Sequence, residues 1–287
     1  MLRSVYALGV AFAVVIARLA GAPSAGATGI VDNFSSYAVG SFPSPAWQDV
    51  GTVSPSPPIA PLPSGTVIST TDAFGHPIQA FEPVSALASS AGIFQSVPVS
   101  SSYSLHADIR VDQYSNAPSA TVEDWAMQLT FAQEGANFAS APQAGIYASS
   151  LTQGWRLYFL GAATGSADID LGVPAPVGEW FTVGLTLDAL TGAYDATIED
   201  TATGTLLTNS TGLLPGWTAA DDTFDTVAFF KGDLSSGDTI GDTGAVTNIN
   251  VTALVPEPAG WLILGTGLVA LLLLGVDHRR RVTPGQG

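Results

Sequence analysis

Apolar and polar residues alternate in several short runs along the middle of the chain, and no long run repeats with a helical period. In residues 103–111, every odd-numbered residue is apolar and every even-numbered residue is polar. A period of two places the apolar side chains on one face, so this run predicts a half-buried strand. The same pattern predicts strands at residues 125–131, 155–159, 181–187 and 194–198, and further strands are expected at residues 30–34, 66–71, 92–97, 224–231 and 246–252.

Two connections between predicted strands share the same turn chemistry. Residues 188–192 read Asp-Ala-Leu-Thr-Gly, and residues 200–204 read Asp-Thr-Ala-Thr-Gly. Aspartate and glycine favour tight turns, so each segment predicts a hairpin. About a dozen short strands joined by segments rich in Gly, Asp, Ser and Pro indicate an all-β fold, an antiparallel sandwich of two sheets.

The first 27 residues have the parts of a secretory signal peptide. A short basic start around Arg3 precedes an apolar run at residues 5–16, and Ala25-Gly26-Ala27 supplies small residues for cleavage. We expect cleavage after Ala27. The predicted β-sandwich then occupies residues 28–254 as one domain. The proline-rich segment 55–63 is expected to be a loop within it, because residues 30–51 are too few to bury a core of their own.

The other end of the chain predicts a transmembrane helix. Residues 261–276 are uncharged and mostly apolar, and as a helix they would span roughly 25 Å, the short end of a bilayer core. A buried core helix is the alternative, but the run is apolar on every face. Arg279, Arg280 and Arg281 follow it and should hold that end on the cytoplasmic side. Pro256, Glu257 and Pro258 precede it.

This order of parts resembles the PEP-CTERM sorting signal of exported bacterial proteins, across residues 255–281. The resemblance implies that an exosortase, a membrane-embedded cysteine transpeptidase-like enzyme, recognises the tail and cleaves near Pro256-Glu257-Pro258. It also implies a membrane-anchored precursor that is sorted to the cell envelope, the cell surface or an exopolysaccharide (biofilm) matrix. Six residues follow the arginines, a small departure from the pattern.

The predicted domain resembles the concanavalin A-like lectin and glucanase jelly rolls, which include laminin-G-like domains. The resemblance rests on residues 32–41, 179–188, 191–198 and 245–251, the last of which resembles their closing strand. It implies a two-sheet jelly roll, often carbohydrate-binding and often stabilised by calcium.

Charge and cysteine content narrow the possible functions. The net charge is −16, and five of the eight basic residues lie in the terminal segments, which leaves Arg110, Arg156 and Lys231 in the domain. Such a surface repels phosphate backbones and excludes nucleic-acid binding. The chain has no cysteine, so neither disulfides nor thiol chemistry are available.

Catalytic patterns are missing from the sequence. Retaining hydrolases on the jelly roll use Glu-x-Asp-x-x-Glu, and no Glu-x-Asp occurs here. Asp168 and Asp170 would share a strand face, but they lack that pattern. His76 and His106 are expected at the surface, without a Gly-x-Ser-x-Gly motif to accompany them. The sequence therefore predicts a non-catalytic adhesion or matrix module, for which the jelly-roll resemblance implies carbohydrate binding. The alternatives are a polysaccharide-active hydrolase or lyase with an unrecognised site, and a purely structural coat protein.

The candidate ligand-binding residues are aspartates, for calcium, and tryptophans, for carbohydrate. Asp233, Asp238 and Asp242 lie in the glycine-rich segment 232–244 and could surround a calcium ion, although aspartates that cap turns are the alternative. A sugar ring stacks on an exposed aromatic face. Trp47 and Trp217 lie in turn-rich segments, and Trp180 lies on the opposite strand face from Phe181. These three tryptophans are the predicted carbohydrate contacts, with core packing as the alternative.

Overall fold

The computed structural model describes residues 29–49, 65–83, 91–100, 102–115, 125–133, 142–161, 166–218, 221, 224–231 and 242–253. The predicted signal peptide, the proline-rich segment 55–63 and the whole predicted sorting tail lie outside these ranges. Within the described ranges, no helix has the length and apolar character needed to cross a membrane.

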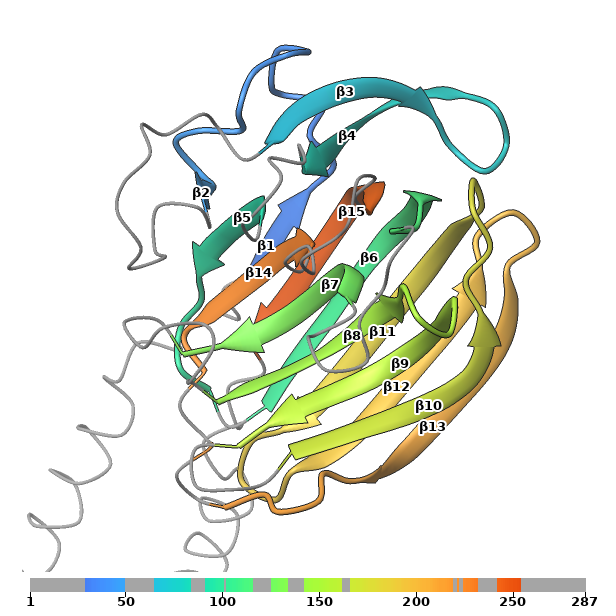
Figure 1. The fold of residues 1–287 in the computed structure, drawn as a ribbon. Coiled ribbons are helices and arrows are strands. Elements are labelled where there is room, and N and C mark those ends of the chain that lie inside the picture. Colours follow the sequence, from blue (N-terminus) through green and yellow to red (C-terminus); the bar gives the residue numbers. More distant parts are fainter. Residues whose placement is uncertain are drawn as a thin grey trace, which may run out of the picture. The chain divides into compact units, whose positions relative to one another are not determined.

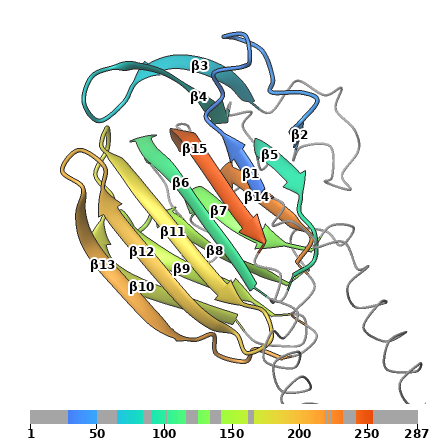
Figure 2. The ribbon, with the colours of Figure 1, turned by 180° about the vertical axis from the view of Figure 1, so that it is seen from behind.

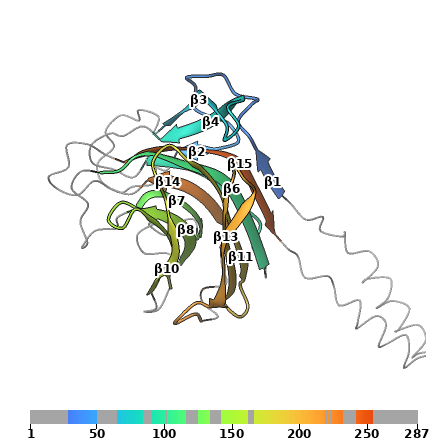
Figure 3. The ribbon, with the colours of Figure 1, turned by 90° about the vertical axis from the view of Figure 1, so that its right-hand side faces the viewer.

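The described residues form two antiparallel sheets packed face to face, which confirms the predicted sandwich (Figures 1 and 3). Sheet A has the strand order β13-β12-β11-β6-β15-β4-β3, and β1 also pairs with β15. Its strands are β1 (Gly29–Asp32), β3 (Gly65–Thr71), β4 (Pro77–Pro83), β6 (Ser102–Gln113), β11 (Trp180–Asp188), β12 (Ala193–Asp200), β13 (Thr205–Leu213) and β15 (Thr243–Ala253).

Sheet B has the order β10-β9-β8-β7-β14-β5-β2. Its strands are β2 (Gln48–Asp49), β5 (Ala91–Ser96), β7 (Trp125–Ala132), β8 (Gln143–Ser149), β9 (Gly154–Leu160), β10 (Ser166–Pro174) and β14 (Thr226–Lys231). Each of the strands predicted from the sequence corresponds to one of these fifteen. The two predicted hairpins are confirmed as well, because the amide of Gly192 donates to Asp188 O and that of Gly204 to Asp200 O, both at 2.8 Å.

The alternation of apolar and polar residues along the strands places the apolar side chains between the two sheets, where they form the core. In β6, Leu105 lies opposite Leu185 of β11 and Ile109 opposite Phe181, so that the apolar faces of neighbouring strands align. Aromatic rings join the two sheets, as where Phe81 of β4 meets Phe229 of β14 with ring centroids 6.4 Å apart. Burial of these side chains is the main stabilising contribution.

Sheet A divides along one side of β15 (Figure 2). Strand β6 pairs with one side of β15, so β4 and β1 must share the other side. Strand β4 pairs at Val246, whereas β1 pairs from Ile249 onward. Between them the register with β6 shifts and Asn248 has φ 51°. Asparagine tolerates this left-handed conformation better than most residues. The division leaves a gap in pairing beside Asn248.

Candidate functional site

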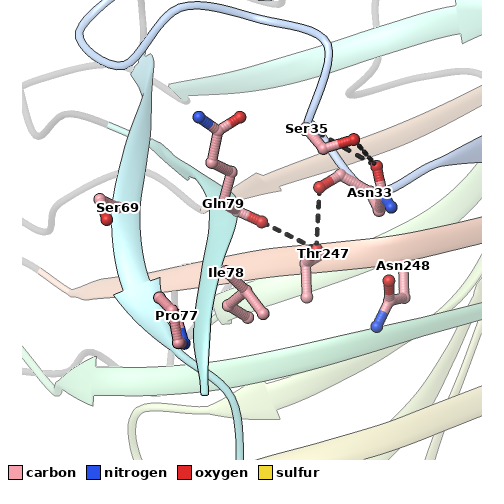
Figure 4. A pocket seen from close by; sticks show the side chains of 8 residues that line it. All are labelled: Asn33, Ser35, Ser69, Pro77, Ile78, Gln79, Thr247 and Asn248. Carbon is pink, nitrogen blue, oxygen red and sulfur yellow. Dashed lines mark hydrogen bonds between the residues drawn. The ribbon is translucent and has the colours of Figure 1, made fainter. Parts of the chain in front are cut away.

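A pocket of about 430 Å³ lies where β1 and β4 separate along β15 (Figure 4). Its volume falls in the range of small-molecule sites, about 300–1,000 Å³. Most of its lining residues are exposed, whereas Thr247 is buried. The residues that line it are Asn33, Ser35, Ser69, Pro77, Ile78, Gln79, Thr247 and Asn248.

Thr247 and Asn248 fix the part of the pocket formed by β15. The Thr247 hydroxyl lies 3.0 Å from Gln79 O and 3.4 Å from Asn33 O, so it can donate to either of the two elements that flank it. The side chain of Asn248 donates to Asp108 Oδ2 at 2.7 Å. The other oxygen of Asp108 accepts from Thr182 Oγ1 at 2.6 Å. These bonds hold the pocket in place across four strands of sheet A, β4, β15, β6 and β11.

Asp32 shapes the loop that carries Asn33 and Ser35. Its Oδ1 accepts the amide of Phe34 at 2.7 Å, which supports the positive φ of 60° at Phe34. Its Oδ2 accepts from Trp47 Nε1 at 2.7 Å and from the Tyr37 hydroxyl at 3.0 Å. Burial, with the bond to Asp32 and its charge, raises the pKa of Tyr37 to about 12. One carboxylate therefore organises the loop.

The side chains of the loop and of β4 complete this wall. Asn33 Oδ1 accepts from the amide of Ser35 at 3.1 Å and from its hydroxyl at 2.7 Å. With its amide nitrogen facing the loop, Gln79 donates to Phe34 O at 2.6 Å and to Tyr37 O at 3.2 Å. The wall is therefore preorganised before any ligand arrives, which reduces the entropic cost of binding.

The chemistry of the lining is neutral. Six of the eight lining residues are amides or hydroxyls, and Pro77 and Ile78 supply apolar surface. Amides and hydroxyls both donate and accept hydrogen bonds, which matches a ligand that carries many hydroxyl groups. None of the described residues that line it is a carboxylate, imidazole or amine, the usual groups of general acid–base catalysis.

The three predicted carbohydrate-contact tryptophans do not line this pocket. Trp47 is 2% exposed, packs against Phe34 and bonds to Asp32. A ring buried to this extent has no face to offer a sugar. The prediction for Trp47 assumed that a residue in a loop is exposed, but this loop folds onto the core.

Trp180 and Trp217 also serve in packing. Trp180 is 5% exposed, and the Arg110 guanidinium covers its ring at 4.8 Å from the centroid. Trp217 is half-buried, and its ring lies 5.2 Å from that of Phe159 and 5.9 Å from that of Phe224. The indole nitrogens donate to the carbonyls of Thr71 and Ala189. The structure thus favours the packing alternative for these residues.

Of the three predicted calcium ligands, Asp242 alone lies in the described ranges. It is 6% exposed, and its oxygens accept from Ser150 Oγ at 2.9 Å and from the Ser115 amide at 2.7 Å. Asp233 and Asp238 lie outside these ranges. In the part of the chain that the structure describes, His, Asp and Glu form no group of three that could hold a metal ion. The described residues therefore do not test the calcium site, and calcium binding stays a prediction.

Other carboxylates and histidines that the sequence singled out have structural partners. Asp168 and Asp170 share a strand face, as predicted, and both face Arg156, with Asp168 Oδ1 2.7 Å and Asp170 Oδ2 3.6 Å from guanidinium nitrogens. The hydrogen bond to Asp168 raises the pKa of Arg156. His76 and His106 are exposed, as predicted. Asp200 accepts two bonds within its own turn. These contacts stabilise turns and strand pairs.

The face of sheet B that points away from sheet A carries a buried cluster of aromatic side chains, with one polar side chain, that of Gln128, among them. Phe94, Tyr147, Tyr158 and Phe230 cluster there. Gln128 lies between them in register, opposite Tyr147 and Phe230, and neither atom of its buried amide has a hydrogen-bond partner in the structure. Because these side chains are at most 9% exposed, this cluster offers no open surface to a ligand. The pocket beside Asn248 is therefore the better candidate.

The comparisons with known proteins give structural similarities at low sequence identity. No protein-family model matches the sequence. No curated protein matches it. Among solved structures, the chain is similar to the lumenal domain of VIP36 bound to Ca²⁺ and Man3GlcNAc, with 8% identity, a TM-score of 0.48, and coverage of 81% of this chain and 90% of that one.

Two further similarities are with a plant and a bacterial protein. Arcelin-5, a lectin-like defence protein from Phaseolus vulgaris, is 10% identical, with a TM-score of 0.47 and coverage of 80% of this chain and 99% of that one. Carbohydrate-binding module CBM66 from Bacillus subtilis is 12% identical, with a TM-score of 0.40 and coverage of 72% and 95%. Similarities at this level do not indicate what this chain binds.

The pocket residues were not predicted because they come from distant parts of the chain. Asn33 directly follows β1, whereas Ser69, Gln79 and Thr247 lie within β3, β4 and β15, so they form no local motif. An asparagine within a predicted strand, such as Asn248, is a local sign of irregular pairing, since asparagine is depleted in regular strands. The sequence thus contains a weak signal for the irregularity and none for the pocket.

Proposed function

We propose that this protein is exported, sorted to the bacterial envelope, and binds a neutral polysaccharide there through the pocket beside Asn248 without catalysing a reaction. The observation that carries this proposal is the pocket lining, which combines amide and hydroxyl groups with the apolar surface of Pro77 and Ile78. A sugar ring presents the same combination, with hydroxyls at its edge and C–H groups on its face. The net charge of −16 further disfavours acidic polysaccharides.

Binding can be tested with the full chain and immobilised polysaccharides, neutral glucans, mannans and galactans beside acidic alginate. Ser69 is exposed and lines the pocket, so Ser69→Trp should fill the pocket with an indole. We expect this variant to bind at least about tenfold more weakly, a loss of about 1.4 kcal/mol. Ser166→Trp, at an exposed serine in β10, is the matched control and should bind like the unchanged protein.

The outcomes of this experiment separate the alternatives. Absence of binding to every polysaccharide would contradict the proposal. Loss of binding in Ser166→Trp, with Ser69→Trp unaffected, would locate the site on sheet B instead. Release of reducing ends during the incubation would favour the polysaccharide-active hydrolase or lyase.

The sorting part of the proposal rests on the C-terminal sequence. Pro256 and Pro258 disfavour regular helix around Glu257, and an extended peptide is accessible to a processing enzyme. An uncharged span and three arginines follow in the order that a membrane stop requires. An exosortase and the membrane are therefore the proposed partners of the tail.

Processing can be followed by the mass of the protein in cells that contain an exosortase. We expect Glu257→Ala, and separately deletion of residues 279–281, to leave an uncut precursor in the inner membrane. Glu179→Ala, at an exposed carboxylate of the β-sandwich, is the control and should be processed normally. Normal processing of both tail variants would refute the sorting proposal.

A further inference from the structure

Three of the four strands at the ends of the two sheets are protected from pairing with another chain. Strand β2 has only two residues. The outer side of β3 is already bonded, since Gly40 N donates to Val67 O at 2.8 Å and Val67 N to Ser41 O at 2.9 Å. Strand β10 carries two aspartates, a register shift and a proline. Short length, coverage, charge, irregular pairing and proline are the usual means by which proteins block sheet edges.

Strand β13, at the remaining end, lacks the charge, the proline and the short length that protect the others, although its pairing with β12 shifts in register opposite Ile198 and Glu199. It runs for nine residues, Thr205–Leu213, without a charged residue or a proline, and no residue of it is buried. Among the described strands it pairs with β12 alone (Figure 2). Leu206, Leu207 and Leu213 are 53%, 44% and 67% exposed. A long, exposed and partly apolar edge strand is a template for pairing with another strand.

A second copy of the same chain fits this edge. In an antiparallel pair centred on Asn209, Leu206 lies opposite Gly212 and Leu207 opposite Thr211, so that large side chains face smaller ones. No charge faces another across this pair, because β13 has none. Two copies that each carry a net charge of −16 repel one another over most of their surface. An uncharged strand is a place where two such copies can meet.

We propose that two copies of this protein pair through β13, antiparallel and about a two-fold axis at Asn209, so that sheet A continues from one molecule into the other. Isologous pairing of this kind is the commonest symmetry of soluble oligomers. The pocket beside Asn248 lies on the other side of β6 from β13, within the same sheet. The dimer would therefore carry two pockets on one continuous sheet.

The absence of cysteine makes site-specific cross-linking a clean test. In the full chain, Asn209→Cys would bring two thiols together at the axis, because directly opposed Cα atoms in an antiparallel pair are about 4.5–5.5 Å apart. A short bis-maleimide at micromolar protein concentration should then give a covalent dimer. The control is Val177→Cys, at a 54% exposed turn residue, and should give little dimer. Equal yields from the two variants would overturn the proposal.

The register is tested with two further variants. Thr205 residues of the two copies would lie about 27 Å apart, eight residues at about 3.4 Å each, so Thr205→Cys alone should not cross-link. A mixture of Thr205→Cys with Leu213→Cys should give the mixed dimer. Dimers formed by Thr205→Cys alone as readily as by the mixture would contradict antiparallel pairing about Asn209.

A charge added to β13 should break the pair. In the Asn209→Cys background, Leu207→Lys should lower the cross-linking yield severalfold, because each copy then places a cation in the contact. Val177→Lys is the control and should leave the yield unchanged. Circular dichroism establishes that both variants fold. An unchanged yield in a folded Leu207→Lys variant would overturn the proposal, whatever the outcome for sugar binding.

Discussion

The outward faces of the two sheets differ, although both sheets share the same core. In β6 of sheet A, buried residues alternate with exposed or half-buried ones along the strand. In β8 and β14 of sheet B, every residue is buried. Sheet A therefore has one solvated face, whereas the central strands of sheet B are buried on both faces. Substitutions at outward positions should consequently be tolerated in sheet A and costly in sheet B.

The largest expected effect comes from neighbouring residues of β14. Phe229 faces the core between the sheets, and Phe230 belongs to the outward cluster, where it is 3% exposed. Removal of either ring should leave a cavity and lower the free energy of unfolding by about 3–5 kcal/mol. Urea denaturation of Phe229→Ala and Phe230→Ala measures both.

The corresponding pair in sheet A supplies the control. Leu185 is buried and Thr186 is half-buried on the next position of β11. We expect Leu185→Ala to cost about 2–5 kcal/mol and Thr186→Ala less than about 0.5 kcal/mol. If Phe230→Ala were as mild as Thr186→Ala, the outward face of sheet B would not be a second buried layer.

One glycine in each sheet allows the same comparison with a smaller expected loss of stability. A Cβ at Gly92, in sheet B, would lie 2.1 Å from Phe229 O, whereas a Cβ at Gly184, in sheet A, would meet the side chains of Thr197 and His106. Backbone cannot move aside without shifting a strand, whereas the exposed His106 and the half-buried Thr197 can change side-chain rotamer. Gly92→Ala should therefore lower the free energy of unfolding, measured by urea denaturation, by about 1–3 kcal/mol. Gly184→Ala should lower it by less than about 1 kcal/mol. Equal costs would contradict the comparison.

The smallest effect concerns Tyr37, beside the solvated sheet. Its pKa is raised from 10.0 to about 12, first by burial and then by Asp32. Between these two pH values the unfolded chain binds fewer protons at this residue than the folded chain, so stability should fall as pH rises from about 10 to about 12. The difference between the ultraviolet titrations of the unchanged protein and Tyr37→Phe should show a step near pH 12.

Asp32→Asn is the companion variant for this titration. It removes the charge that disfavours the tyrosinate, so the step should move toward lower pH. Asp168→Asn provides the matched control, because Asp168 accepts a bond from Tyr147 in sheet B and does not contact Tyr37. A step at pH 10 in the unchanged protein would contradict the role assigned to Asp32.

Strict alternation predicted several strands whose two faces differ. Strand β6 alternates strictly from Tyr103 to Val111, and its neighbours β11 and β12 were found in the same way. Strand β8 was missed because it is buried on both faces and reads Gln-Ala-Gly-Ile-Tyr-Ala-Ser, with no period of two. Strand β13 was missed for the opposite reason, since none of its residues is buried. Strand β4 begins and ends with proline, which disfavours a strand assignment.

The pocket could not be predicted because it depends on which strands become neighbours. Thr247 contacts Asn33 and Gln79, which are separated from it by 214 and 168 residues, and no local pattern encodes that meeting. The prediction for Trp47 met the same difficulty. Trp47 lies in a loop, but its indole nitrogen donates to the carboxylate of Asp32, a partner that the local sequence does not reveal. Local sequence indicates whether a residue lies in a strand or a loop, but not which partner covers it.

The position of β15 has a consequence for how the chain matures. The last of the described strands lies in the interior of sheet A, between β6 on one side and β1 and β4 on the other. Before residue 253 is made, these earlier strands lack the partner that joins them, and contacts between such distant segments form slowly. A growing chain that does not yet include β15 therefore cannot complete its native sheet. A polypeptide that stays incompletely folded while it is being made is well suited to threading through a translocation channel.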